Sequence, residues 1–300
     1  GGLPMATAIP MLMGANIGTT LTSTLVSLGM VRQKEDFRRA FAAASVHDFF
    51  NLLAVVIFLP LEMMFGLLDR VSTFFADQLA GSDGGLFATI FAGIGTAVTT
   101  VTDPLADLIG MIGDVLPEPW GGIPLILIGI GLILAVINFI GVLLKVVMVG
   151  KAKQVLHNAI GRGPLSGILS GTLITVMVQS SSTTTSLMVP LAGSGTFSLK
   201  QVYPFTLGAN IGTTITALIA AFAFTSIEAR LALQAALVHL LFNLFATILI
   251  YGLPFLRNIP VFGATTLARL GSENKLYIAG WVLGVFLALP ALLIFLTVIL

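Results

Sequence analysis

The feature that most limits the fold of this chain is an apolar segment that occurs twice. Residues 9–20 read IPMLMGANIGTT, and residues 203–214 read YPFTLGANIGTT. The likeness continues downstream, where VHDFFNL at 46–52 returns as VHLLFNL at 238–244. Duplicated apolar units with a polar, glycine-interrupted core build the central binding sites of many membrane carriers. The sequence therefore predicts two related structural halves.

The composition is that of an integral membrane protein. Hydrophobic residues make up 57% of the chain and charged residues 9%, whereas a soluble domain carries about 25% charged residues. Cysteine is absent, which excludes disulfides and thiolate chemistry. The three histidines have no metal-binding spacing and no Walker motif is present, so neither a metalloenzyme nor an ATP-driven machine is indicated. A net charge of +1 gives no reason to expect a nucleic-acid partner.

Apolar runs predict the membrane helices of an all-α fold, since each span needs about 20 apolar residues. The runs cover 5–31, 40–68, 123–149, 202–224, 231–252 and 276–300. Segment 164–192 differs because the polar run QSSSTTTS at 179–186 interrupts it. Each of its arms, of about 14 residues, is too short to cross a hydrocarbon core of about 30 Å. We therefore expect a re-entrant hairpin with a polar tip.

Charge asymmetry predicts the orientation of the chain in the membrane. Loop 69–122 holds seven of the thirteen acidic residues and one basic residue, whereas basic residues mark 32–39, 150–163 and 253–275. The positive-inside rule places these three basic segments in the cytoplasm and loop 69–122 outside. The helix that follows the first basic segment and its counterpart in the second half would then run in opposite directions. The two repeats are thus expected to have inverted topology, which is linked to alternating access.

The predicted organisation contains two repeats and the segments that join them. Residues 1–68 form repeat 1 without its hairpin, and 164–252 form repeat 2 with hairpin 164–192. Between them lie an extracellular loop at 69–122 and a linking helix with a cytoplasmic loop at 123–163, and 253–300 hold a cytoplasmic loop and a final helix. Repeat 2 has a long segment before its motif and repeat 1 has almost none, so repeat 1 is expected to lack its N-terminal part.

The polar run of hairpin 164–192 is the first candidate site. Seven consecutive hydroxyl residues, Ser180 to Ser186, follow Gln179. Hydroxyls donate to an oxyanion and offer lone pairs to a small hard cation, and a helix N-terminus at the hairpin tip favours anions. The alternative is helix–helix packing, which Ser and Thr mediate in membranes. The unbroken run favours a ligand site.

The repeated Gly-Ala-Asn-Ile-Gly-Thr-Thr motifs are the second candidate site. Two glycines four positions apart, with Asn between them, are expected to loosen a helix and free backbone carbonyls. Carbonyl, Asn and Thr oxygens are suitable sodium ligands. The alternative is a packing face made by Gly14 and Gly18, and by Gly208 and Gly212. The two roles are compatible.

Asp48 is an acid in an otherwise apolar helix. A carboxylate at membrane depth is costly and usually faces a cavity and a cation. The alternative is a buried acid hydrogen-bonded to His47 or to a hydroxyl. The matching histidines and asparagines of the two copies are interpreted as polar groups that bridge helices; these are His47, His239, Asn51 and Asn243.

Together, these motifs closely resemble those of the type II sodium-dependent phosphate cotransporters. The likeness rests on QSSS at 179–182, on both GANIGTT copies, and on FRRAF at 37–41 running into VHDFFN at 46–51, all in the family's order. It spans 1–68 and 150–252. The short, cysteine-free outer loop is similar to that of bacterial members.

The resemblance implies sodium-coupled uptake of inorganic phosphate, with a Gln-Ser-Ser hairpin from each repeat facing the other around the anion. The residues that it implies in phosphate binding are Gln179, Ser180, Ser181, Ser182, Asn16, Thr19, Thr20 and Asn210. Those that it implies in sodium binding are Gln179, Ser180, Thr183, Thr213, Thr216 and Asp48. By analogy with the spacing from Gln179 to Asn210, the hairpin of repeat 1 falls before residue 1. An acid at Asp48, after Ala42 and Ala44, is similar to that of electrogenic members.

The resemblance therefore predicts an electrogenic sodium:phosphate symporter that works by alternating access in the cell membrane. Its expected partners are inorganic phosphate, sodium ions and the lipid bilayer, and no nucleic acid. One alternative is a symporter of another oxyanion, such as sulfate or a carboxylate, and a second is a non-transporting regulatory or structural membrane module. An enzyme is not expected, because Ser180–Ser182 have no sequence-adjacent base. The oligomeric state is left open.

Overall fold

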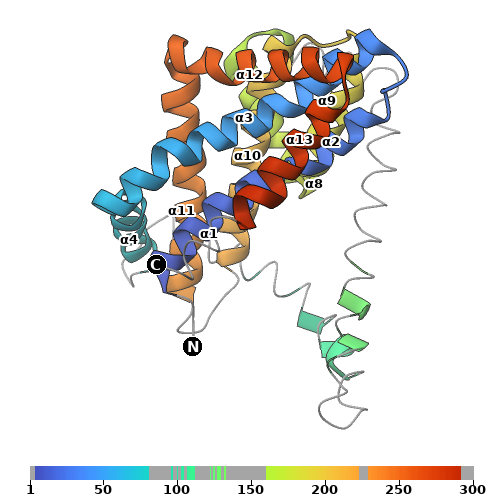
Figure 1. Ribbon diagram of the computed structural model, residues 1–300. Coiled ribbons are helices and arrows are strands. Elements are labelled where there is room, and N and C mark those ends of the chain that lie inside the picture. The colour runs from blue at the N-terminus through green and yellow to red at the C-terminus, as the bar shows by residue number, and fades with distance from the viewer. Residues whose placement is uncertain are drawn as a thin grey trace.

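The computed structural model describes residues 4–80, 160–222 and 229–291, together with scattered residues between 96 and 132. Within these ranges every regular element is helical and no strand occurs (Figure 1). Three helices are long and apolar enough to cross a membrane, at Lys34–Phe65, Leu199–Ala221 and Arg230–Tyr251. The expectation of an all-α membrane protein is confirmed.

The described helices follow one another in this order along the chain: α1 (Met5–Gly18), α2 (Leu21–Leu28), α3 (Lys34–Phe65), α4 (Leu67–Ala80), α8 (Pro164–Val178), α9 (Ser181–Gly193), α10 (Leu199–Ala221), α11 (Ala229–Ala246), the short π-helix η1 (Thr247–Tyr251), α12 (Pro254–Glu273), α13 (Leu276–Leu283) and the short π-helix η2 (Gly284–Ala288). The predicted helix at 123–149 and most of loop 69–122 lie outside the described residues.

The single helix predicted at 5–31 is two helices, α1 and α2, which are broken at Thr19 and Thr20. The Thr19 hydroxyl donates to the Asn16 carbonyl and the Thr20 hydroxyl to the Ile17 carbonyl, each at 2.9 Å. Hydroxyl groups that bond to carbonyls three residues back compete with the helical ladder. The end of the first repeated motif is therefore a helix break.

Helix α3 starts earlier than expected, at Lys34 instead of residue 40. Its first turn carries Glu35 and Asp36, whose negative charges suit the positive end of a helix. It ends at Gly66, which adopts the left-handed conformation with φ 58°. Helix α4 follows at once, so the predicted outer loop 69–122 begins with helical residues up to Ala80.

The predicted cytoplasmic loop within 253–275 is instead a helix, α12, which starts with a proline at its first position. Figure 1 shows α12 running across the end of α11. Its buried residues recur every three or four positions, at Pro260, Ala264, Ala268 and Gly271. The helix packs on α3, with Gly263 against the Phe49 ring. Polar and charged residues interrupt its apolar residues, so the sequence contains no continuous apolar run here and predicts a loop.

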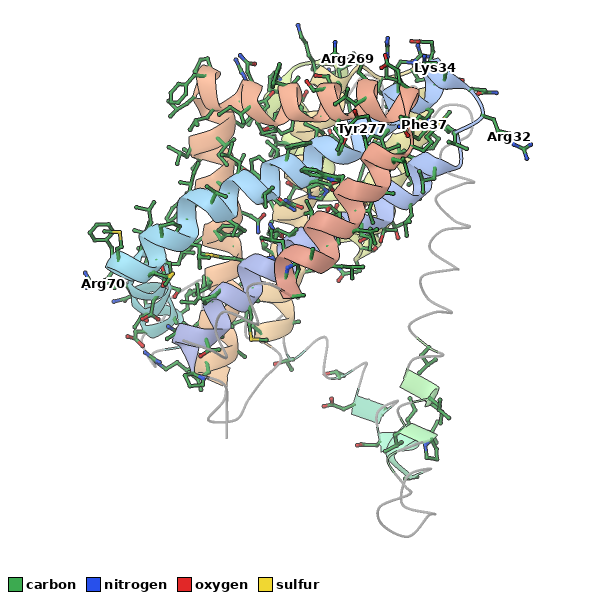
Figure 2. The ribbon with its side chains drawn as sticks, in the orientation of Figure 1. Arg32, Lys34, Phe37, Arg70, Arg269 and Tyr277 are labelled. Atoms are coloured by element: carbon green, nitrogen blue, oxygen red, sulfur yellow. The ribbon has the colours of Figure 1, made fainter. Side chains whose placement is uncertain are left out.

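Charged residues gather at the end of the bundle where α12 lies. Figure 2 shows Arg32, Lys34 and Arg269 at this end and Arg70 at the other. The two described segments that were predicted to be cytoplasmic from their charge thus lie at the same end of the molecule. Which side of a membrane this end faces stays a prediction.

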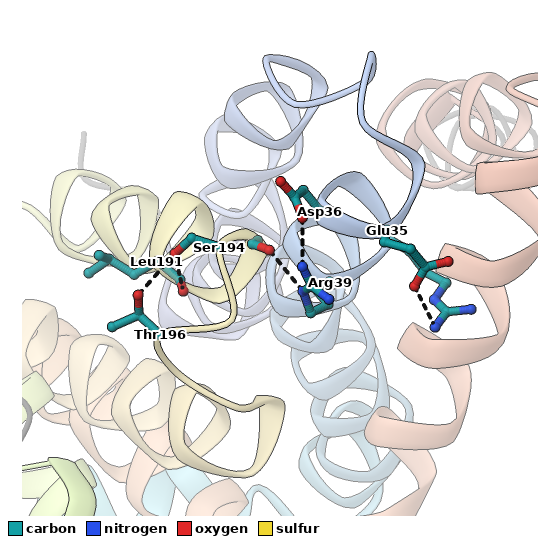
Figure 3. A network of polar contacts seen from close by, with 8 residues as sticks. Glu35, Asp36, Arg39, Leu191, Ser194 and Thr196 are labelled. Atoms are coloured by element: carbon teal, nitrogen blue, oxygen red, sulfur yellow. Dashed lines mark hydrogen bonds and ion pairs between the residues drawn. The ribbon is translucent and has the colours of Figure 1, made fainter.

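The expected hairpin 164–192 corresponds to the short helices α8 and α9, with 15 and 13 residues. At 1.5 Å per residue each is about 20 Å long, short of a hydrocarbon core of about 30 Å. Re-entry into a bilayer stays a prediction. The far end of α9 is fixed to α3 by Arg39, whose Nε donates to the Gly193 carbonyl at 2.8 Å while its Nη2 pairs with Asp36 (Figure 3).

Helices α8 and α10 pack closely through glycines. A Cβ atom at Gly208 would overlap the Ile168 carbonyl, and one at Gly171 would overlap the Phe205 carbonyl. One turn further along, a Cβ at Gly212 would collide with Thr175. Helix α10 is continuous through the second motif, so the loosening expected there is not seen. The packing role proposed for Gly208 and Gly212 is the one that the structure has.

Candidate functional site

The break between α8 and α9 centres on Gln179. Its backbone has φ 59° and ψ 22°, and within the described ranges it is the one non-glycine residue with a positive φ. The left-handed conformation costs a non-glycine residue about 1–2 kcal/mol, and strain of this kind clusters at functional sites. The Gln179 side chain is exposed, and its Nε2 donates to the Val176 carbonyl at 2.6 Å.

Ser180 caps the N-terminus of α9. Its Oγ accepts a hydrogen bond from the Thr183 backbone N–H at 3.2 Å and donates to the Thr183 hydroxyl at 2.9 Å. The backbone N–H groups of the first turn of a helix have no partner within the helix and carry partial positive charge. The tip of the α8–α9 hairpin thus combines helix N–H groups with serine hydroxyls, as an oxyanion site requires.

This tip lies against the α1–α2 break of the first repeat. The Ser182 hydroxyl donates to the Thr19 carbonyl at 3.4 Å, and the hydroxyls of Ser23 and Thr185 are 3.0 Å apart. We call the buried hydroxyl residues along this contact the hydroxyl seam; they are Thr20, Ser23, Thr24, Ser27, Ser181, Thr184 and Thr185. Two helix breaks from different halves therefore meet along a polar interface.

Asp48 borders the hydroxyl seam and is fully buried. Its Oδ2 accepts hydrogen bonds from the Thr24 hydroxyl at 3.3 Å and from the Trp281 indole N–H at 3.1 Å. Its Oδ1 has no partner in the described part of the chain. The alternative of a buried acid bonded to a hydroxyl is thus present, with Thr24 as the partner and not His47. A buried carboxylate oxygen without a hydrogen-bond partner calls for an explanation, and sodium binding by Asp48 stays a prediction.

Trp281 is a member of this site that sequence reasoning missed. Besides its bond to Asp48, its ring stacks on Phe49, with 4.3 Å between centroids. Nothing in the local sequence of the last helix marks this tryptophan, because its partners lie in the first repeat. Its indole N–H fixes one carboxylate oxygen of Asp48 and leaves the other open.

The residues proposed for sodium fall into two groups. The packing of α8 on α10 pairs Gly171 with Phe205 and Thr175 with Gly212, and Thr213 and Thr216 follow this contact on α10. Thr213 and Thr216 donate their hydroxyl protons to carbonyls of α10, at 3.2 and 2.7 Å. Sodium binding by these hydroxyls stays a prediction. Asp48 belongs to the second group, at the hydroxyl seam.

Asn16 and Asn210, at the centre of the two motifs, each form hydrogen bonds with residues of the other half. Asn16 Nδ2 donates to Asn243 Oδ1 at 3.1 Å, and Asn210 Nδ2 donates to Asn51 Oδ1 at 2.9 Å. The histidines also contact the other half: His47 Nε2 lies 2.7 Å from Asn210 Oδ1, and His239 Nε2 lies 3.4 Å from Asn16 Oδ1. The interpretation of the histidines and of Asn51 and Asn243 as helix-bridging groups is confirmed. Contact of Asn16 and Asn210 with phosphate stays a prediction.

The chain is similar to known proteins. Residues 132–256 match the sequence profile of the family described as Na+/Pi-cotransporter. Over 96% of its length the chain is 30% identical to sodium-dependent phosphate transport protein 2B of Bos taurus, and over 97% it is 30% identical to protein 2A of Rattus norvegicus. Over nearly its whole length the chain is therefore similar to the type II sodium-dependent phosphate cotransporters.

The relatives are transport proteins by name, which agrees with the expectation that the chain is not an enzyme. The three apolar helices agree with a membrane protein. The chain spans about half the length of the relatives that it matches, 53% of the bovine 2B protein and 55% of the rat 2A protein. No solved structure matches the chain at a significant level.

Proposed function

We propose that this type II cotransporter relative moves inorganic phosphate into the cell together with sodium ions, by alternating access. The proposal rests on one observation above all. The α8–α9 tip lies against the α1–α2 break, with Ser182 bonded to the Thr19 carbonyl. Two helix breaks that face one another from different halves are the arrangement that secondary transporters use for ion and substrate binding.

The chemistry of the tip suits a phosphate that is accompanied by cations. Gln179 and Ser180–Ser182 offer an amide, three hydroxyls and the N-terminus of α9 to an oxyanion. No lysine or arginine occurs between residues 164 and 193 to neutralise it. A multiply charged anion without counter-charge is too costly in a water-poor site. Sodium held by the hydroxyls of Ser180, Thr183, Thr213 and Thr216 would supply the missing charge.

Asp48 supports electrogenic coupling in this proposal. Its Oδ1 is buried and unpartnered among the described residues, whereas Oδ2 is held by Trp281 and Thr24. A sodium ion bound by Oδ1 and the neighbouring hydroxyls would remove the cost of the buried charge. An additional cation at this position adds positive charge to each transport cycle, so phosphate uptake would carry current.

In this proposal the two copies of the repeat move relative to one another to give alternating access. Each copy gives an asparagine, a histidine and a second asparagine to the hydrogen-bond network between the halves, as two halves related by a two-fold axis would. In this proposal the network joins the halves while the tip and the α1–α2 break open to one side or the other. The protein would sit in the cell membrane with several spans and with loop 69–122 outside.

The proposal is tested with purified protein in phosphatidylcholine vesicles that are loaded with potassium. External sodium is expected to drive accumulation of labelled phosphate, and external potassium, which sets up no sodium gradient, is not. Competition by unlabelled sulfate or carboxylates would show instead a carrier for another oxyanion. If correctly folded protein gives no sodium-driven accumulation, the alternative of a non-transporting membrane module is favoured and the proposal fails.

A further inference from the structure

A cavity of about 430 Å³ opens at the end of the bundle where α12 lies, away from the α8–α9 tip. The first residues of α8, α10 and α12 and the last residues of η1 form its walls. Two basic residues line it, Lys200 on α10 and Arg257 on α12, and none of its described lining residues is acidic. The cavity thus has a positive charge that no carboxylate in its described wall offsets.

Neither cation has an ion pair in the described part of the chain. The three ion pairs found there join Arg38 to Glu35, Arg39 to Asp36 and Arg230 to Asp77. Lys200 takes part in none of them, and Arg257 lies against Tyr251, with its Cζ 5.3 Å from the ring centroid. No carboxylate among the described residues therefore neutralises either cationic group.

Tyr203, which lines the cavity, has a buried hydroxyl without a partner. The residue is 2% exposed, and its Oη has no hydrogen-bond partner among the described residues. Its ring packs edge-on to that of Tyr251, with 5.2 Å between centroids. An unsatisfied buried hydroxyl costs about 1–3 kcal/mol, and most such groups in native structures have a ligand or water as their partner. The Tyr203 hydroxyl requires an acceptor.

The start of α8 adds a third source of positive potential. Gly163 precedes the helix with φ 136°, Pro164 occupies its first position, and no side chain caps it. Both residues line the cavity. An uncapped helix of 15 residues presents backbone N–H groups and the positive end of its dipole to whatever lies beyond its end. Helix end, two cations and hydroxyl donor all favour an acceptor-rich anion.

A second arginine-lined cavity nearby lacks this character. It has a volume of about 360 Å³ and three arginines in its wall, Arg38, Arg39 and Arg269. Arg38 and Arg39 are already paired with acids of the first turn of α3, as Figure 3 shows for Arg39. An anion there would have to compete with Glu35 and Asp36 for two of the three arginines.

We propose that the cavity between the starts of α8, α10 and α12 binds a phosphate group. Lys200, Arg257 and the Tyr203 hydroxyl would all contact this group. The group is either free inorganic phosphate or the phosphate of an anionic lipid headgroup, since both present the same oxygen acceptors. This site is separate from the α8–α9 tip and does not depend on transport through it. Its location at the foot of α8 would let its occupant stiffen the base of the hairpin.

The test uses the purified chain with Gln179→Ala, in sodium-free buffer, so that the proposed transport site does not contribute. One arm measures the rise in unfolding temperature with inorganic phosphate. The other counts phosphatidylglycerol molecules retained by native mass spectrometry after reconstitution in mixed phosphatidylglycerol and phosphatidylcholine. Saturable binding in the first arm identifies free phosphate, and a retained lipid in the second identifies a headgroup; either result supports the site.

Variants decide whether binding occurs in this cavity. Lys200→Gln and Arg257→Gln are each expected to weaken binding about tenfold, and Tyr203→Phe about fivefold, from the usual strength of charged and neutral hydrogen bonds. Arg269→Gln is the matched control, because it removes the same charge from the same helix outside this cavity. If Arg257→Gln does not fold, Tyr203→Phe, which removes a single oxygen, decides. No binding of either probe, or an equal loss in Arg269→Gln, would overturn the proposal.

Discussion

Asn210 Nδ2 donates a hydrogen bond of 2.9 Å to Asn51 Oδ1, at the contact between the two copies of the repeat. The corresponding bond of the other copy joins Asn16 to Asn243 at 3.1 Å. All four side chains are buried. The asparagine at the centre of each repeated motif therefore binds the other half of the protein.

Asn210→Ala is expected to lower the free energy of unfolding by about 2 kcal/mol, because it leaves buried groups on Asn51 and His47 without a partner. The measurement is chemical denaturation of the purified protein in detergent. Asn258→Ala is the control, since Asn258 is exposed, and its stability should not change. Equal stability of both variants would contradict a structural role for the network.

Gly208→Ala should destabilise the protein, and Gly14→Ala should not, although both positions begin the same motif. A Cβ at Gly208 would overlap the Ile168 carbonyl, whereas nothing lies within 4 Å of a Cβ at Gly14. Overpacking costs about 1–3 kcal/mol, while alanine is the better helix former by about 1 kcal/mol. Thermal unfolding of the two variants in one detergent tests this. Similar shifts for both would show that α8 and α10 do not pack through Gly208.

Asp48→Gly is predicted to abolish the phosphate-evoked current and to retain some phosphate uptake. The substitution removes the free Oδ1 that is proposed to bind an additional sodium ion. The current is measured on a solid-supported membrane, and uptake in parallel vesicles. Trp281→Phe is the companion variant, since it removes the donor to Oδ2 and keeps a ring beside Phe49; current should persist. An unchanged current in Asp48→Gly would remove Asp48 from the coupling scheme.

Ser181→Ala is predicted to abolish sodium-driven phosphate uptake at normal expression. Ser181 is the first residue of α9 and lies in the hydroxyl seam. Ser194→Ala, at the exposed far end of the same helix, is the matched control and should transport normally. Vesicle uptake with equal amounts of each protein gives the comparison. Normal uptake by Ser181→Ala would exclude the α9 N-terminus from the phosphate site.

The sequence predicts those elements whose signal is local. Long apolar runs identify α3, α10 and α11, and the polar run after Gln179 identifies the break between α8 and α9. The helices α4 and α12 give no such signal, because polar and charged residues interrupt their apolar residues. The break at Thr19 also escapes it: the same Thr-Thr pair lies inside a continuous α10 in the second copy. Packing around the helix therefore decides whether the motif breaks it.

The sequence predicts only part of the candidate site, because only some of its residues are neighbours in the chain. Residues that are consecutive in the chain, such as Ser180–Ser182, share the tip by necessity. The contact of Trp281 with Asp48 joins the two ends of the chain, and no local pattern marks it. The hydrogen bonds of each Asn and His to the other copy depend on how the two copies face each other. A comparison of two sequence segments gives no information on that arrangement. The sequence therefore predicts which polar residues belong to the site, but not which residues they contact.

In the proposed function, Gln179 keeps a strained backbone because its side chain and its helix break form the transport site. Gln179→Gly relieves the left-handed conformation, so it is expected to raise the free energy of unfolding by about 1 kcal/mol. The direct measurement is sodium-driven phosphate uptake by Gln179→Gly and Gln179→Ala in vesicles. The account predicts a folded and more stable Gln179→Gly protein that, like Gln179→Ala, takes up no phosphate. Uptake at the wild-type rate by both variants would contradict it.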